Sequence, residues 1–157
     1  MNARQLWTRW SAYFLLTAII RCVIPGLSLA GDATTNPNVN VWTHLSRQSF
    51  RAGETGELTI TFAPREGYHI NAAPPVSVVM QESGPLILKG PPALSVDKKT
   101  GFLSTKAPVR QAFSVSGTTP PGSHIVKGTI TYSYTSDAKG WTRRVHQPVS
   151  LSFMLTE

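Results

Sequence analysis

Cysteine is nearly missing from this chain. Its 157 residues include one, Cys22, and that residue lies in an N-terminal segment with the composition of an export signal. The chain from residue 31 onward has no cysteine. It can therefore form no intramolecular disulfide, although exported domains commonly use them, and it offers no thiolate for redox or nucleophilic chemistry.

A long apolar run is also missing from the N-terminal segment. Its apolar core, residues 12–20, is nine residues long, whereas a membrane-spanning helix needs roughly 20. The core follows Arg4 and Arg9, and small residues at 28 and 30 occupy the positions that a signal peptidase reads. An arginine and a Pro-Gly pair beyond the core argue against the alternative, an uncleaved membrane anchor. The sequence predicts a signal peptide at 1–30, cleaved after Ala30, a periplasmic location and no transmembrane segment after cleavage.

Acidic residues are few, and basic residues outnumber them. The net charge of +7 counts 15 lysines and arginines against 8 acids. Three of the arginines lie in the predicted signal peptide, which leaves 12 bases against 8 acids and a net charge of +4. These bases are spread along the chain, with two adjacent pairs and no dense basic stripe. The sequence therefore favours solvated surface charge over a nucleic-acid-binding surface.

Catalytic motifs are missing as well. The chain has no G-x-S-x-G elbow, no S-x-x-K pair and no glycine-rich phosphate loop. Its glutamates, Glu54, Glu57, Glu66 and Glu82, fall in or beside predicted turns, where solvated surface is their usual place. We therefore predict a protein that is not an enzyme and that needs no cofactor.

Metal ligands are few and not closely spaced. Neither H-x-H nor M-x-x-M occurs, and the two mature-chain methionines fall in strand patterns where filling a core is the usual role. Ligand type alone gives only a weak expectation of a copper-type site. Such a site is an alternative that would have to draw on His44, His69, His124, His146, Met80 and Met154.

The sequence does contain short runs of alternating apolar and polar residues, separated by turns rich in glycine and proline. In one of them Leu58, Ile60 and Phe62 are predicted to face inward. About eight such strands are typical of an all-β, immunoglobulin-like two-sheet antiparallel β-sandwich. We expect a flexible lead-in at 31–40, one such domain at 41–157, and strands at 39–45, 56–63, 68–71, 76–81, 86–89, 109–116, 124–134 and 145–155.

Two stretches resemble a known family. They are FRAGETGELTITFAPREGYHINAAPP, which ends at residue 75, and the late strand-turn-strand GTITYSYTSDAKGWTRRVHQPVSLSF. On these residues the chain, over about 47–155, resembles the N-terminal periplasmic domain of the thiol:disulfide interchange protein DsbD. The resemblance implies an immunoglobulin-like sandwich and a family signature run at Gly67, Tyr68, His69, Ile70 and Asn71.

The resemblance also implies where a redox site would lie. In the DsbD N-terminal domain, two cysteines flank the tip of the late hairpin and cycle between dithiol and disulfide. The matching positions here are Thr135 and Thr142. Thiol-disulfide exchange needs a thiolate that attacks sulfur, so threonine cannot perform it. We expect a redox-inactive hairpin; the alternative is an ordinary hairpin that never held cysteines.

The parts of the hairpin that remain favour protein binding. Aromatic side chains commonly anchor interfaces, and we expect Trp141 to be exposed beside the tip. The resemblance implies a periplasmic partner of thioredoxin fold, with contacts from Tyr134, Ser136, Asp137, Trp141 and Arg143. Tyr68 and His69 are expected to pack rather than to bind. The alternative is a component of a thiol-disulfide, cytochrome c maturation or copper-handling system that binds a metal ion through histidine or methionine.

Overall fold

Nine β-strands run through residues 36–157, the part of the chain that the computed structural model describes. The predicted signal peptide, 1–30, lies outside the described residues. Between residues 36 and 157 there is no helix, and so none that is long and apolar enough to cross a membrane. The strands are β1 (Val39–Leu45), β2 (Ser49–Arg51), β3 (Thr55–Pro64), β4 (Tyr68–Ile70), β5 (Ser77–Met80), β6 (Leu86–Leu88), β7 (Val109–Val115), β8 (Gly122–Ser136) and β9 (Thr142–Thr156).

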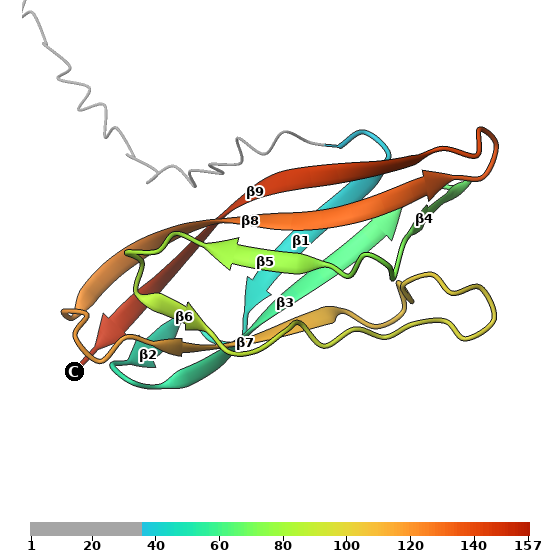
Figure 1. Cartoon of the computed structure of the whole chain (residues 1–157). Coiled ribbons are helices and arrows are strands. Elements are labelled where there is room, and N and C mark those ends of the chain that lie inside the picture. The colour runs from blue at the N-terminus through green and yellow to red at the C-terminus, as the bar shows by residue number, and fades with distance from the viewer. Residues whose placement is uncertain (1–35) are drawn as a thin grey trace, which may run out of the picture. The chain divides into compact units, whose positions relative to one another are not determined.

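The strands form two sheets, as the alternating pattern predicts (Figure 1). One sheet has the order β1-β3-β7-β6, and the other has the order β2-β9-β8-β4, with β5 also paired to β8. The immunoglobulin-like β-sandwich is confirmed, and each of the eight predicted strands is present. The ladders are antiparallel except for β2, which pairs with β9 in parallel and was not predicted.

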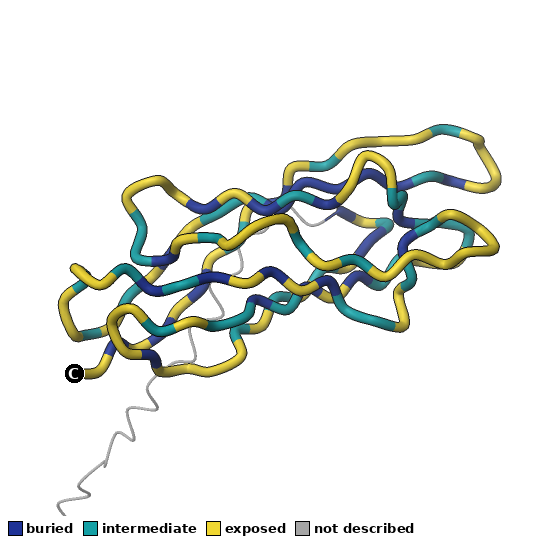
Figure 2. The backbone as a smooth tube through the Cα atoms, turned by 60° about the horizontal axis from the view of Figure 1, so that its bottom comes forward, coloured by how far each residue is buried: buried dark blue, intermediate teal, exposed yellow. Residues whose placement is uncertain are grey.

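The core lies between the inner faces of the two sheets. Leu58, Ile60 and Phe62 on β3 are buried, as predicted, and the same alternation buries Val126, Ile130, Tyr132 and Tyr134 on β8. Figure 2 shows buried and exposed positions alternating along the strands. A strand places successive side chains on opposite faces, so every second residue of β8 and β9 faces away from this core.

The domain begins earlier than the sequence predicts. Val39 is buried in β1, and Asn36 donates a hydrogen bond from Nδ2 to the hydroxyl of Tyr132 at 3.1 Å. Asn38 does the same for Tyr134 at 3.2 Å. Residues 36–40 are therefore part of the sandwich rather than of a flexible lead-in, because their polar side chains satisfy tyrosine hydroxyls at the edge of the core.

Candidate functional site

The tip of the β8-β9 hairpin has a fixed register. Thr135 pairs directly with Thr142, and the next pair closes the loop, with the Ser136 N–H donating to the Trp141 carbonyl at 3.0 Å. Gly140 ends the loop with a φ of 63°, in the left-handed region that favours glycine, and its N–H donates to the Ser136 carbonyl at 2.8 Å. The two threonines therefore face each other across the end of the ladder.

The threonine pair is held by a short chain of hydrogen bonds. The hydroxyl of Thr135 donates to Oδ1 of Asn71 at 2.9 Å, and the two threonine Oγ1 atoms are 2.8 Å apart. Each hydroxyl has one hydrogen to donate, so the Thr142 hydroxyl is the donor to Thr135. Thr135 is half-buried and Thr142 is exposed. The tip thus has an ordered pair of hydroxyls with one member open to solvent.

The signature run lies beside this tip as strand β4. Tyr68 pairs with Ser136, and His69 pairs with Thr135. The loop adds a further bond, since the Asp137 N–H donates to the Gly67 carbonyl at 2.9 Å. Two segments more than 60 residues apart in the sequence therefore form one surface at the edge of β8.

His69 faces outward on this surface and makes two contacts. Its Nε2 lies 2.7 Å from Oδ2 of Asp137, and its ring stacks on Phe102 with centroids 4.7 Å apart and planes 10° apart. The side chains of His69 and Asp137 are 42% and 52% exposed, so solvent screens their pairing. We expected His69 to pack rather than to bind; its ring packs on Phe102, but 42% of the side chain stays exposed. Phe102, in contrast, has no sequence pattern that marks it as part of the site.

An aromatic cluster supports the hairpin from its inner face. Trp141 packs edge-on against Tyr134, with centroids 5.5 Å apart, and lies 6.0 Å from Tyr68. The guanidinium of Arg143 covers the indole at 4.5 Å. Trp141 is half-buried rather than exposed, and Tyr134 and Ser136 are buried. Those two side chains are therefore not available to a partner.

Asp137, Trp141 and Arg143 are the predicted contact residues that retain accessible surface. Asp137 and Arg143 are exposed, while Trp141 offers only part of its ring. The alternation along β8 explains why Tyr134 is buried and Thr135 is not. Because Tyr132 faces inward, Tyr134 must face inward too, and Thr135 must face outward.

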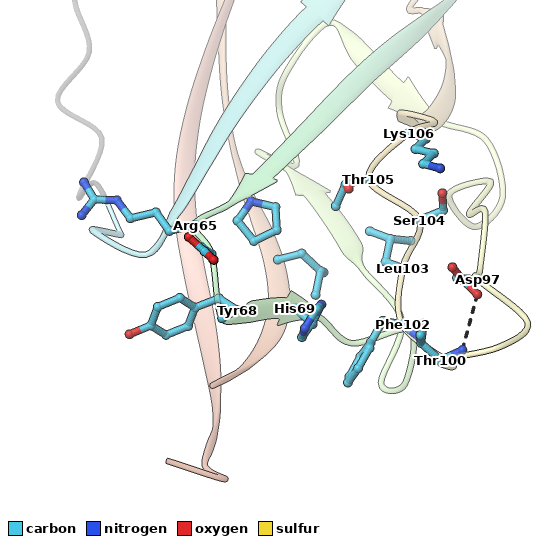
Figure 3. Close-up of a pocket in the computed structure, with 14 residues that line it drawn as sticks. Arg65, Tyr68, His69, Asp97, Thr100, Phe102, Leu103, Ser104, Thr105 and Lys106 are labelled. Atoms are coloured by element: carbon cyan, nitrogen blue, oxygen red, sulfur yellow. Dashed lines mark hydrogen bonds between the residues drawn. The ribbon is translucent and has the colours of Figure 1, made fainter. Parts of the chain in front are cut away.

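A cleft of about 470 Å³ opens beside β4 (Figure 3). His69 and Phe102 lie next to each other in its lining, and Arg65 and Lys106 also line it. The loop opposite β4 is shaped by Asp97, whose carboxylate accepts the N–H groups of Lys99 and Thr100 at 2.8 and 3.4 Å. No pattern in the sequence marks this loop, because it has no alternation and no motif.

The candidate metal ligands are not brought together. Across residues 36–157, no three His, Cys, Asp or Glu side chains form a group that could hold a metal ion. His146 instead bonds Thr131 at 3.0 Å, and His124 bonds the Pro120 carbonyl at 2.8 Å. His44 is exposed on β1.

The two methionines have different environments. Met80 is buried, as expected for a core residue, but Met154 is 46% exposed, so a core role was the wrong prediction for Met154. Met154 lies opposite Ser123 on β8 and Met80 lies opposite Gly128. Five residues of an extended strand span roughly 16 Å, so the two sulfurs do not form a common site.

Comparisons with known proteins add little on function. No protein-family model matches the chain, and no curated protein matches it. Among solved structures, the crystal structure of the GAE domain of yeast GGA1 is similar, with 16% sequence identity, a TM-score of 0.43, and coverage of 74% of this chain and 94% of that domain. A likeness at this level carries no functional argument.

Proposed function

We propose that this chain is an exported, non-catalytic protein-binding module that docks a thioredoxin-fold protein in the periplasm through its hairpin tip. The observation that carries the proposal is the pair Thr135 and Thr142, directly opposed with their hydroxyl oxygens 2.8 Å apart. These are the positions at which the resemblance to the DsbD N-terminal domain implies a redox-active cysteine pair. A thioredoxin-fold protein would then meet the site through the surface around its own active-site cysteines.

The tip is built to bind without reacting. A threonine hydroxyl does not ionise at physiological pH and cannot exchange with a disulfide. The hydrogen bonds among Thr142, Thr135 and Asn71 link the two strands at the place where a disulfide would cross-link them. A tip that is already ordered loses little conformational freedom on binding, which favours affinity.

The accessible part of the tip defines the contact surface. We define it by Thr142, Asp137 and His69, which lie on the outward-facing side of the tip, with the cleft beside them; Arg143 lies on the opposite face of β9, over Trp141. Trp141 and Tyr68 lie behind this surface and keep it rigid. Replacing Trp141 would therefore disturb folding as well as docking, and an exposed position separates the two effects better.

Thr142→Arg tests the proposal at such a position. The protein is exported, purified and titrated with a purified thioredoxin-fold protein that carries a C-x-x-C motif. Near 1 M salt, where attraction between charges is screened, the bulk of an arginine at the centre of the contact surface is expected to weaken binding by about tenfold or more, the scale of a central interface residue. Ser150→Arg is the matched control, since Ser150 is exposed on the same face of the sheet and pairs with Lys127, far along β8.

Unfolding temperatures of both variants are measured alongside the titrations. If the wild-type protein binds the probe and Thr142→Arg binds it as tightly, the hairpin tip is not the docking surface. If the wild-type protein does not bind thioredoxin-fold probes in either redox state, the proposed partner class is wrong.

A further inference from the structure

The positive charge of the domain gathers at the end that carries the hairpin tip. Seven of the twelve lysines and arginines in residues 36–157 lie there, and all seven are exposed. Three belong to the hairpin and four to the segments that surround the cleft. They are Lys139, Arg143 and Arg144, and Arg65, Lys98, Lys99 and Lys106.

The fold, and not the sequence, brings these bases together. The segment 97–106 is held against β4 by the bridge between Asn71 and Phe102 and by the stacking of Phe102 on His69. β4 in turn pairs with the tip of β8. Figure 1 shows the hairpin tip, β4 and this long loop at the same end of the sandwich.

The acids do not balance this charge. Three acids accompany the seven bases: Glu66, Asp97, which caps its own loop, and Asp137, which faces His69. This end therefore carries a formal charge of +4. The rest of residues 36–157 has five bases and four acids, a charge of +1. Two of those five are paired with acids, at 2.6 Å for Arg47 with Glu54 and 3.0 Å for Arg110 with Glu57.

We infer that the partner docked by the hairpin tip presents an acidic face around the groove that receives the tip. This inference rests on the proposed docking function and adds the chemistry of the partner. A cluster of one sign on one surface raises the association rate with a surface of opposite sign and repels one of like sign. The charge at this end thus selects among thioredoxin-fold proteins by the acids around their active sites.

A folded protein fits this surface better than a bilayer or a nucleic acid. Membrane-surface binding uses apolar side chains that insert beneath the basic ones, but at this end Trp141 and Tyr68 are packed against the sandwich and Phe102 is stacked on His69. Single-stranded nucleic acid needs exposed aromatic faces for stacking, and the indole of Trp141 is covered by Arg143. Acids interleaved with the bases, such as Glu66 and Asp137, suit a protein surface of mixed charge.

Association kinetics with two matched probes test the inference. Both probes are purified thioredoxin-fold proteins with the same C-x-x-C motif; one has acids around the motif, and in the other these acids are replaced by amides. At low ionic strength we expect the acidic probe to associate with the exported protein about tenfold faster. Near 1 M salt, where the Debye length falls to about 3 Å, this advantage should disappear.

A pair of charge reversals locates the effect. Lys139→Glu changes the charge at the tip by two and is expected to slow association of the acidic probe about threefold at low salt. Lys127→Glu makes the same change on the outer face of β8, eight residues before Thr135, and should leave the rate unchanged. Equal sensitivity of the two variants would overturn the inference.

The outcomes separate this inference from the docking proposal. If both probes bind equally fast at all salt concentrations but Thr142→Arg still weakens binding, the tip docks a partner without charge selection and the inference is wrong. If Thr142→Arg has no effect, the docking proposal itself fails. Binding to vesicles rich in anionic lipid that Lys139→Glu abolishes would overturn the assignment to a protein partner.

Discussion

Replacing Thr135 and Thr142 together by cysteine is expected to create an intramolecular disulfide. The Ser136–Trp141 pair is hydrogen-bonded, so the adjacent Thr135–Thr142 pair occupies a non-hydrogen-bonded position of the antiparallel ladder, with Cα atoms about 4.5 Å apart. This separation lies at the short end of the range of about 4.4 to 6.8 Å that disulfides use. The bond should form on exposure to oxidised glutathione.

The expected stabilisation follows from the size of the closed loop. Residues 135–142 form an eight-residue loop, for which the chain-entropy relation gives ~2.5 kcal/mol. Losing the threonine hydrogen bonds costs about 1 kcal/mol, so the oxidised variant should exceed the wild type by about 1.5 kcal/mol. For a domain of this length that corresponds to a rise in Tm of about 6 °C.

Thermal unfolding with and without reductant measures this change, and a thiol assay counts free cysteines. The matched control is Thr135→Cys with Arg144→Cys, two residues out of register, where the Cα atoms are about 7–8 Å apart and a bridge requires backbone movement. Two persistent free thiols in the Thr135/Thr142 variant, or equal oxidation of the control, would refute the register of the tip.

Two further predictions concern the core that supports the tip. Tyr132→Phe should lower the free energy of unfolding by about 1–3 kcal/mol in urea titrations, because the hydroxyl accepts from Asn36 and donates to Gln147. Burial raises the pKa of Tyr132, and the Asn36 hydrogen bond opposes that rise. The folded state therefore binds the phenol proton more tightly than the unfolded state does. The resulting contribution to stability is present below about pH 10 and is lost as the pH rises further. This alkaline loss should be smaller in Tyr132→Phe, and an equal loss would contradict it. Gly128→Ala should lower the free energy of unfolding by about 1–3 kcal/mol, since an added Cβ would lie 2.6 Å from a methionine sulfur and 2.7 Å from a backbone oxygen of β5. Gly117→Ala is the control, because a Cβ added there has nothing within 4 Å. Equal losses of stability in the two variants would contradict this packing of Gly128 against β5.

The strands were predictable because each has a face in the core. Leu58, Ile60 and Phe62 alternate with polar residues, and the structure buries all three. The same rule along β8 puts Tyr134 on the face of Tyr132, so the prediction that Tyr134 contacts a partner conflicted with the alternation, and the structure buries it. β2 was not predicted, because a strand of three residues is too short to show periodicity. Its parallel pairing with β9 and the burial of Phe50 are seen in the structure alone.

The candidate site was only partly predictable. The positions of Thr135 and Thr142 came from a resemblance, and the hairpin places the two directly opposite each other. Phe102 and the cleft depend on a loop that reaches β4 from 30 residues away, a tertiary contact that no local pattern encodes. The basic end of the molecule was missed for the same reason, since bases such as Arg65 and Lys139 are distant in sequence and meet only in the fold.

The proposed docking requires that the hairpin tip contact the active-site cysteine of a thioredoxin-fold protein. In the chain from residue 31 onward, Thr142→Cys introduces a single thiol at the tip, and Ser150→Cys introduces one at the distant control position. Each thiol is converted to a mixed disulfide with thionitrobenzoate. A thioredoxin-fold probe that retains only the first cysteine of its C-x-x-C motif then attacks with its thiolate, forms a protein–probe disulfide and releases the coloured thiolate.

Docking would hold the attacking sulfur next to position 142 and so raise the rate of exchange there. We predict that exchange is about tenfold or more faster at position 142 than at position 150. Equal exchange rates at the two positions would mean that the tip and the probe do not dock, and would contradict the proposed function.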